Sequence, residues 1–472
     1  MEDWRRDARR EAVITDIEGL VPKDHLLRKI EKVMDYEWIY ERLDPYYCHE
    51  NGRPGTDPVV LIKMVLIQHI YGIPSLRQTC QRIQDTLSYR WFLGYGLMDE
   101  IPHFATVSYA FCQRFPEELT EEIFSHILNK ALNNRMVDPK MIFIDGTHIK
   151  ASANKKKYQK EKVAKTAKIY AAQLREEVNA EREKLGKAPI EEKKDPPASD
   201  GGRIERTLST TDPESGMFVK GEHERQFAYE AHTACDRKGF VLEVEVTAGN
   251  IHDSVAWDAL YDQVTRRFPE AKFVTMDAGY KTPWIAKKVL DDGRIPVLPY
   301  SNHHYKAGQY KPREYEYDPG TDTFTCPHGG VLRHTTTDKE GKRTYRSDVK
   351  HCRNCPFKSQ CGANEKGQKA LITNIWQEYL DLVEQIRRTD RGKELYAMRK
   401  ETIERVFADA KEKHAMRYTH LRGLARVSHW VRLKYAAMNL KKLAEWSWDS
   451  SCFCRFFFPF LPEYAKTPVS AC

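Results

Sequence analysis

The stretch Met141–Lys157, MIFIDGTHIKASANKKK, decides how the chain is organised. Four apolar residues lead to Asp145, a turn-like Gly-Thr follows, and three lysines come soon after. A short continuous apolar run of this kind is typical of a buried strand. We therefore expect Asp145 at a strand end, either as an ordinary turn residue or as one ligand of a metal site that acts on a polyanion. Lys155, Lys156 and Lys157 either contact a phosphate backbone or begin a charged helical insertion.

The composition describes a globular chain with a local excess of positive charge. Of the 472 residues, 41% are hydrophobic and 31% are charged, which argues against wholesale disorder. The length allows about two to four domains. The net charge of +8 permits nucleic-acid binding without showing it. Residues 387–446 alone hold 16 Lys/Arg against 7 Asp/Glu, a local charge of +9.

Nothing in the chain resembles a targeting or membrane segment. The N-terminus, MEDWRRDARR, is charged and has no apolar core, so we expect no secretory signal. The longest apolar run near the other end, around FCRFFFPFLP, is far shorter than the ~20 residues that span a bilayer. We therefore expect a cytoplasmic protein with no membrane association.

Residues 1–137 are predicted to be a helical domain. Asp57 is a plausible N-cap with Pro58 at the first helical position. A turn containing Gly and Pro ends that helix, and Ser75 with Gln78 makes a capping box that opens the next one. Two helices joined by a tight turn are either a DNA-binding helix-turn-helix or an ordinary helical hairpin.

The pattern changes at Met141, where apolar strands begin to alternate with amphipathic helices. The predicted strands are residues 141–145, two within 227–249, 272–277 and 294–300; the predicted helices are residues 253–268, 282–293 and 394–416. Two insertions interrupt this series. Residues 153–225 are charged and contain a predicted amphipathic helix, with Val163, Ala167, Tyr170, Leu174 and Val178 three or four residues apart. Residues 301–375 are rich in turns and cysteine, and residues 447–472 form an aromatic tail of unexplained role.

Without the insertions, the order resembles the ribonuclease H-like fold, a mixed sheet flanked by helices, within an α/β class. In that fold the first and fourth strands are neighbours, which would bring Asp145 and Asp277 together. Glu404 lies on the last predicted helix. Ligand sites lie outside the carboxyl ends of such strands, and converging carboxylates hold hard divalent cations. Two such ions can promote in-line phosphoryl transfer.

Four sequence blocks closely resemble those of DDE transposases from bacterial insertion sequences. They are FIDGTHIKASANKKK, AYEAHTACDRKGFVLEVEVTAGNIHDS, TMDAGYKTP and RKETIERVFADAKEKHAMRYTHLRGLARV. They look most like the branch whose core carries a Cys-containing insertion, and GRPGTDPVVLIKMVLIQHIYGIPSLRQTCQRIQ resembles the helical domain placed first in those transposases. The resemblance covers residues 53–446 and implies that residues 138–446 form the catalytic domain. It implies that Asp145, Asp277 and Glu404 are catalytic and bind two Mg²⁺ ions, for which Mn²⁺ could substitute.

The same resemblance implies basic residues near Glu404. Tyr396, Arg399 and Lys411 look like the family's tyrosine, arginine and lysine, and Lys411 shares a helix face with Glu404. Arg399 precedes Glu404 by five residues, one more than the family pattern, so Lys400 is the competing choice. The predicted DNA contacts are Lys155, Lys156, Lys157, Arg399, Lys400, Lys411 and Arg422.

Four cysteines in the second insertion have metal-ligand spacing. Cys352 and Cys355 form a tight knuckle, and Cys326 and Cys361 would complete a structural zinc site. His328 and His351 could substitute as ligands, and free thiols packed in the insertion are the alternative reading. His148, His232 and His252 accompany the four blocks that carry the resemblance, but we assign them no chemical role.

The resemblance implies a DNA transposase that cleaves phosphodiesters at transposon ends and joins the 3′-hydroxyl ends to target DNA. Its partners would be terminal inverted repeats, target DNA and a second copy of the chain during synapsis. It would be associated with the bacterial nucleoid. Two alternatives remain open: a hydrolytic nuclease or resolvase of the same fold, and a catalytically silent, domesticated transposase acting as a DNA-binding protein.

Overall fold

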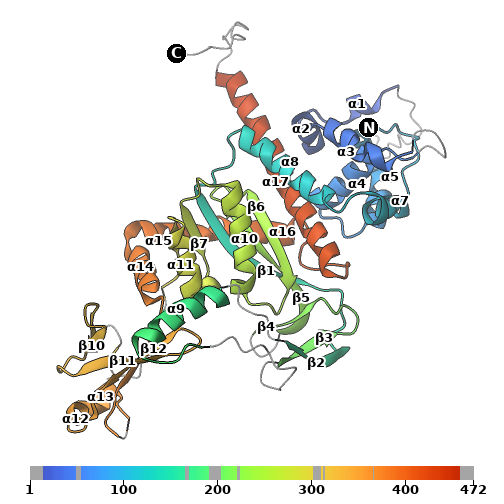
Figure 1. Ribbon diagram of the computed structural model, residues 1–472. Coiled ribbons are helices and arrows are strands. Elements are labelled where there is room, and N and C mark those ends of the chain that lie inside the picture. Colours follow the sequence, from blue (N-terminus) through green and yellow to red (C-terminus); the bar gives the residue numbers. More distant parts are fainter. Residues whose placement is uncertain are drawn as a thin grey trace, which may run out of the picture. The chain divides into compact units, whose positions relative to one another are not determined.

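The computed structural model describes residues 14–48, 55–164, 170–190, 203–220, 224–300, 310–311, 314–364 and 366–457 (Figure 1). These residues divide into two compact units. The first unit contains the described residues up to Asp138, Lys238–Leu242 and those from Arg405 onward; the second contains Pro139–Arg237 and Glu243–Glu404. The grouping differs from the predicted boundary at residue 446, because the helices after Glu404 belong to the helical unit. Residues 458–472 of the predicted tail lie outside the described residues.

The first unit is built from helices around the buried helix α4. Every residue of α4 is buried, and α3, α5, α6 and α17 pack against it. The long helix α17 also packs against α2 and α8, and no described helix is long and apolar enough to cross a bilayer. The predicted helical N-terminal region is thus confirmed. Its main helices are α1 (Ile17–Leu20), α2 (Leu26–Val33), α3 (Glu37–Leu43), α4 (Pro58–Ile70), α5 (Leu76–Asp85), α6 (Leu87–Leu93), α7 (Phe104–Tyr109), α8 (Leu119–Asn133) and α17 (Leu424–Phe457).

The turn between α4 and α5 has the predicted caps. The Asp57 side chain accepts hydrogen bonds from two amides of the first turn of α4, at 2.7 and 3.3 Å. Ser75 Oγ accepts from Gln78 N at 3.3 Å. Gly72 has a φ of +59°, and a Cβ there would lie 2.6 Å from the Lys413 carbonyl oxygen. Both the positive φ and this close approach require glycine.

The second unit contains a mixed sheet in the order β2-β3-β4-β5-β1-β7-β8, with β6 paired to β5. The central strand β1 is antiparallel to β5 and parallel to β7, and β7 is parallel to β8. This confirms a mixed α/β arrangement in which the strand of Asp145 adjoins the strand before Asp277. The strands are β1 (Met141–Lys150), β2 (Tyr158–Ala164), β3 (Arg203–Ser209), β4 (Gly216–Lys220), β5 (Glu224–Asp236), β6 (Val241–Ala248), β7 (Phe273–Met276) and β8 (Ile295–Val297).

Helices cover this sheet at β5, β7 and β8 (Figure 1). Helix α10 packs on β5, α11 and α14 pack on β8, and α15 packs on β7 and β8. Trp257 of α10 is fully buried, and its indole N–H donates to the Met276 sulfur at 3.1 Å. The helices of this unit are α9 (Ala171–Lys184), α10 (Asp253–Arg267), α11 (Pro283–Asp291), α14 (Gln377–Arg388) and α15 (Asp390–Ala397). Helix α16 (Ile403–Glu412) begins in this unit, and its residues from Arg405 onward belong to the first unit.

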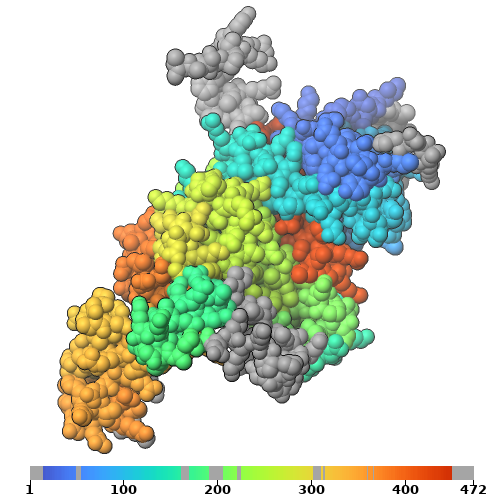
Figure 2. All heavy atoms as spheres, viewed as in Figure 1, coloured from blue at the N-terminus to red at the C-terminus, as the bar shows by residue number. Residues whose placement is uncertain are grey.

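A second, antiparallel sheet forms most of the Cys-containing insertion (orange in Figure 2). Its small core consists of Tyr315, Leu332, Tyr345 and Leu371. Helix α9 packs on β11, and Leu174 and Val178 of α9 are buried with Ile375 and Trp376. The elements are β9 (Glu316–Asp318), β10 (Thr323–Thr325), β11 (Val331–Thr337), β12 (Lys342–Ser347), α12 (Val349–Cys352), α13 (Lys358–Cys361) and β13 (Ala370–Asn374).

The first insertion contains strands that were not predicted beside its amphipathic helix. Strands β2, β3 and β4 extend the main sheet, and Val163 lies in β2. Only the second half of the apolar pattern is helical, since α9 begins at Ala171. The residues at 165–169, which include Ala167, lie outside the described residues. Strand β2 is rich in Lys and Glu and pairs with β3 along its length, so backbone pairing outweighs the helical spacing of its few apolar residues.

Two other predictions about local structure are also corrected. Strand β1 does not end at Asp145 but continues to Lys150, because Gly146–Lys150 pair with His232–Ala228 of β5. The helix predicted over residues 394–416 is broken into α15, a 3-10 turn over Met398–Lys400 (η6) and α16. This break changes which side chains reach the acidic residues.

Candidate active site and a neighbouring acidic cluster

Strand register places Asp145 and Asp277 side by side. Strands β1 and β7 are paired in parallel from Met141 with Phe273 to Ile144 with Met276. The next residue along β1 is Asp145, and the residue directly after β7 is Asp277. Since parallel strands in register keep equivalent residues at one level, both carboxylates lie at the same edge of the sheet.

One arginine binds both carboxylates. Arg399 Nη2 lies 2.5 Å from Asp145 Oδ2, and Arg399 Nη1 lies 2.8 Å from Asp277 Oδ1. The Tyr396 hydroxyl lies 3.4 Å from Asp277 Oδ1 and 3.3 Å from Arg399 Nη1. A planar guanidinium presents its donors in a fixed fork, so the two carboxylates must converge. Arg399 Nε is buried and has no hydrogen-bond partner among the described residues.

The two aspartates differ in their protonation because they differ in burial. The Asp145 side chain is 19% exposed and that of Asp277 is 47% exposed. Burial raises the pKa of Asp145 to about 6 despite the opposing charge of Arg399. Burial also acts to raise the pKa of Asp277, but the Ala278 amide and Arg399 together hold that pKa below its ordinary value. Asp145 is therefore the carboxylate with the greater need of a positive partner.

Arg399, and not Lys400, is the basic residue that contacts the two aspartates. Arg399 is buried against both aspartates, whereas Lys400 is exposed. The additional residue between Arg399 and Glu404 is accommodated by the 3-10 turn η6, which separates α15 from α16. Glu404 lies exposed in the first turn of α16, and in the described part of the chain it makes no ion pair with Arg399.

The remaining sequence-predicted DNA contacts belong to other segments of the chain. Lys155, Lys156 and Lys157 are exposed in the turn between β1 and β2. They therefore do not begin a helix. Lys411 is half-buried at the end of α16, and Arg422 is exposed before α17; both belong to the helical unit.

A second acidic cluster, formed by Glu230, His232 and Asp253, was missed by sequence reasoning. One ligand atom from each of these residues lies within 4.8 Å of the others. Glu230 pairs across the strands with His148, and His232 pairs with Gly146. Since side chains alternate along a strand, this cluster projects to the sheet face opposite Asp145. A charged Glu230 within the apolar stretch FAYEAHTAC was the available signal; Asp253 looked like an ordinary acid at a helix start.

The acidic cluster is buried, which perturbs all three of its members. Burial, and then the charge of Asp253, raise the pKa of Glu230 well above its ordinary value. Burial also raises the pKa of Asp253. Burial lowers the pKa of His232 to about 4, so this imidazole is neutral near pH 7.

Two glycines follow the site aspartates because the acidic cluster leaves no room for side chains there. A Cβ on Gly146 would lie 2.6 Å from Glu230 Oε1. A Cβ on Gly279 would lie 2.2 Å from Asp253 Oδ2. The sequences Asp-Gly and Asp-Ala-Gly therefore make room for the cluster directly after the two site aspartates, and they connect the two groups of acids.

Two family models match this chain. The family described as Transposase domain (DUF772) matches residues 15–113, within the helical unit. The family described as Transposase DDE domain matches residues 325–444, which include Arg399 and Glu404. The chain belongs to the DDE transposases of insertion sequences. This family comprises nucleic-acid-processing enzymes. No curated protein and no solved structure matches the chain. Asp145 and Asp277 of this transposase lie outside both matched ranges, so their assignment depends on the geometry above.

The insertion of this transposase gathers its four cysteines around one small cavity of about 20 Å³. Cys326, Cys352, Cys355 and Cys361 line it together with His328 and His351. The Gly330 amide donates to Cys326 Sγ at 3.2 Å. Among the described residues, no three of these cysteines and histidines have ligand atoms within 4.8 Å of one another. The predicted zinc ligands therefore line one cavity, but their ligand atoms are farther apart than in a compact metal site.

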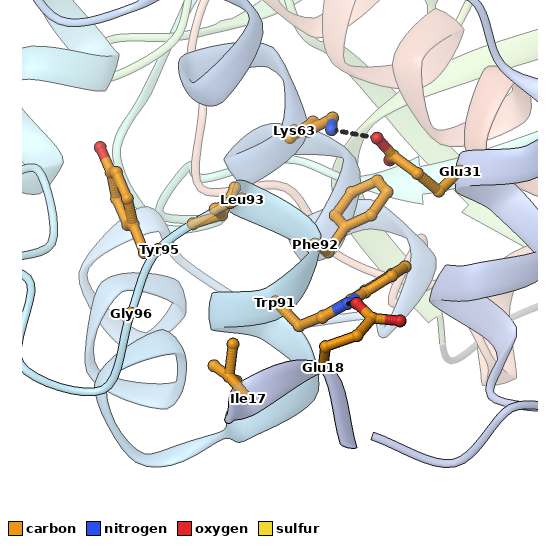
Figure 3. A pocket seen from close by; sticks show the side chains of 10 residues that line it. Ile17, Glu18, Glu31, Lys63, Trp91, Phe92, Leu93, Tyr95 and Gly96 are labelled. Carbon is orange, nitrogen blue, oxygen red and sulfur yellow. Dashed lines mark hydrogen bonds and ion pairs between the residues drawn. The ribbon is translucent and has the colours of Figure 1, made fainter. Parts of the chain in front are cut away.

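The helical unit of the transposase has a larger pocket of about 400 Å³, shown in Figure 3. Its two acids are already satisfied by neighbouring groups. Lys63 Nζ lies 2.7 Å from Glu31 Oε1 (Figure 3), and Glu18 binds Arg28 and the Trp91 indole. None of the sequence-predicted site residues lines this pocket, so we do not assign the chemistry to it.

Proposed function

We propose that this chain is a DNA transposase that cleaves phosphodiesters at transposon ends and joins the freed 3′-hydroxyls to target DNA. The observation that carries this proposal is the placement of Asp145 and Asp277 on adjacent parallel strands, under one arginine. The order β6-β5-β1-β7-β8, with β1 antiparallel to β5 and parallel to β7, supports a ribonuclease H-like core.

The donor set fits a hard divalent cation. Asp145 and Asp277 offer converging carboxylate oxygens, the donors that Mg²⁺ prefers, and the buried Asp145 requires positive charge. In our proposal Asp145, Asp277 and Glu404 hold two Mg²⁺ ions, for which Mn²⁺ could substitute. When bound, the ions supply charge stabilisation at the phosphate and an activated oxygen nucleophile.

Arg399 has two tasks in this proposal. Its Nη atoms hold the two carboxylates facing one another, and Tyr396 steadies both Arg399 and Asp277 through its hydroxyl. Its buried Nε has no protein partner among the described residues. In our proposal this donor binds a phosphate oxygen after the side chains that cover it move on DNA binding. Arginine is suited to this combination because its fork binds oxyanions at several points.

DNA contacts outside the acidic site would fix the position of the duplex. Helix α5 exposes Arg77, Gln78, Gln81 and Arg82 on its polar side, as a recognition helix for terminal repeats requires. Phosphate contacts would come from Lys155, Lys156, Lys157, Lys400, Lys411 and Arg422, which makes binding strongly dependent on salt. Synapsis of two transposon ends implies at least a dimer of the chain.

The test uses the purified chain, linear DNA with the transposon ends, and a target plasmid. We expect Mg²⁺-dependent cleavage at the ends and joined products on a gel. Pre-cleaved ends separate the alternatives, because a transposase joins them to the plasmid and a hydrolytic nuclease or resolvase does not. Complete absence of nicking with either substrate would favour the domesticated DNA-binding protein and contradict our proposal.

We also propose that Cys326, Cys352, Cys355 and Cys361 bind a structural Zn²⁺. The cavity that they share, and the Gly330 amide directed at Cys326 Sγ, support this proposal. His351 is the alternative fourth ligand, since it lies beside Cys326 at Gly330. A small antiparallel sheet with a core of four buried residues gains much of its stability from such an ion.

Removing one knuckle cysteine is expected to remove the zinc. We predict one Zn²⁺ per reduced chain by elemental analysis, and loss of that Zn²⁺ in Cys355→Ser because a thiolate ligand is gone. Cys112→Ser is the matched control, since Cys112 is an exposed cysteine of the helical unit and its loss should leave the zinc content unchanged. A reduced, unsubstituted chain without zinc would refute the site.

A further inference from the structure

Glu230, which is buried, and Asp253, whose side chain is 30% exposed, form a close pair of carboxyl groups without a lysine or arginine partner among the described residues. Glu230 is only 4% exposed, and its ion-pair partner is His148, whose Nε2 lies 3.4 Å from Glu230 Oε2. Asp253 approaches His232 Nδ1 at 3.9 Å. By contrast, Asp145 and Asp277 share Arg399. Two carboxylates this close, one of them buried, favour either a shared proton or a bound cation.

The hydrogen bonds of His232 indicate which of its nitrogens carries the lone pair that a metal ion would use. The Thr247 hydroxyl donates to the Ala248 carbonyl at 3.3 Å, so its oxygen is available as an acceptor. His232 Nε2 lies 3.0 Å from that oxygen and therefore carries the proton. The unprotonated Nδ1 lies 3.9 Å from Asp253 Oδ1 and accepts a hydrogen bond from the Tyr280 hydroxyl at 3.2 Å, which a bound ion would displace. A second-shell bond that fixes the imidazole tautomer in this way is the usual arrangement at a metal-binding histidine.

The elements around the cluster hold its three donors in place. Glu230 and His232 are two residues apart on β5, so their side chains lie on the same face of the sheet. Asp253 opens α10, which packs on β5. Gly146 and Gly279 remove the side chains that would otherwise fill the space beside the carboxylates. The three donors are thus two oxygens and one nitrogen from rigid elements.

We propose that Glu230, His232 and Asp253 bind a divalent transition-metal ion at a site distinct from that of Asp145 and Asp277. Two carboxylates suit a hard cation, and the one imidazole favours a transition-metal ion such as Mn²⁺ over Mg²⁺. The ion compensates the buried negative charge and ties α10 to β5. Because Gly279 abuts Asp253, it also fixes the loop that carries Asp277. The proposal does not depend on transposase activity, since the site is measured without DNA.

The test measures Mn²⁺ binding to the full chain with Asp145→Asn and Asp277→Asn, which removes the first site. Mn²⁺ is the probe because thiolates of the cysteine cavity bind it poorly. From the free-Mn²⁺ resonance signal we expect one bound Mn²⁺ per chain. Adding Glu230→Gln and Asp253→Asn should weaken this binding by at least about tenfold. Asp262→Asn is the matched control, because Asp262 is a half-exposed acid of the same helix α10 and its loss should change nothing.

A spectroscopic readout covers the case in which the fourfold variant fails to fold. Mn²⁺ bound to the chain with Asp145→Asn and Asp277→Asn alone should show nitrogen hyperfine coupling from His232, and His232→Gln should abolish that coupling. A chain that binds no Mn²⁺ would mean that the carboxyls share a proton only, and this result would overturn the proposal. Tight binding without nitrogen coupling, or binding unaffected by the Glu230 and Asp253 substitutions, would overturn it as well.

Discussion

Replacing Asp145 or Asp277 by asparagine is expected to abolish DNA cleavage while DNA binding persists. Asparagine keeps the shape of the side chain and can still accept a hydrogen bond from Arg399. It removes the negative charge with which the carboxylate would hold Mg²⁺. Metal-supplied charge stabilisation is worth several kcal/mol, so each substitution should slow cleavage by at least about 10³-fold. Nicking of end-bearing DNA, followed on a gel under single-turnover conditions, measures this effect.

Binding and folding controls make that result specific. Asp291→Asn changes an acid of α11 that pairs with Lys287 away from the site and should cleave at the unsubstituted rate. All variants should bind DNA equally by fluorescence anisotropy at one fixed salt concentration, because phosphate contacts dominate affinity. Glu404→Gln should behave like the two aspartate variants. An active Asp277→Asn chain would exclude the proposed chemistry outright.

The pairing of Asp145 with Asp277 could be predicted because two short patterns matched a known fold. Two apolar runs, MIFI and FVTM, each precede an aspartate, and the resemblance to the ribonuclease H-like fold implied that their strands are neighbours, as the register of β1 and β7 has it. The acidic cluster could not be predicted in this way. Asp253 follows Glu230 by 23 residues, and the two meet only because β5, β6 and α10 fold back on one another. No single stretch of sequence contains that arrangement.

The break between α15 and α16 was not predictable, because it has no local cause in the sequence. Residues 397–402, AMRKET, contain neither glycine nor proline and have good helix propensity. The structure nevertheless forms a 3-10 turn there, and Arg399 of that turn is buried against both aspartates. The pairing of the buried Arg399 with both aspartates outweighs a propensity difference of a few tenths of a kcal/mol per residue. Tertiary electrostatics thus decided the local structure.

Replacing Arg399 by alanine is expected to have the second large effect, on both stability and cleavage. Without Mg²⁺, the loss leaves Asp145 buried beside Asp277 with no counter-charge, which should lower the free energy of unfolding by about 3 kcal/mol. Saturating Mg²⁺ should recover part of that stability, since the ion supplies positive charge to the same carboxylates. Denaturant unfolding with EDTA and with Mg²⁺ measures both values. Lys400→Ala is the matched control, because Lys400 is the exposed neighbour and should change neither.

Cleavage by Arg399→Ala at saturating Mg²⁺ separates the two tasks assigned to this side chain. If Arg399 served only as a counter-ion for the aspartates, Mg²⁺ would restore the rate along with the stability. If its buried Nε also binds the phosphate, the rate should stay about 10²-fold low, the usual effect of losing one donor to a developing negative charge. Arg399→Lys should recover stability more than rate, because a single ammonium cannot reproduce the planar fork. If Arg399→Ala cleaved DNA at the full rate in Mg²⁺, Arg399 would serve only as a counter-ion that Mg²⁺ can replace. That result would contradict the proposed contact between its Nε and the phosphate.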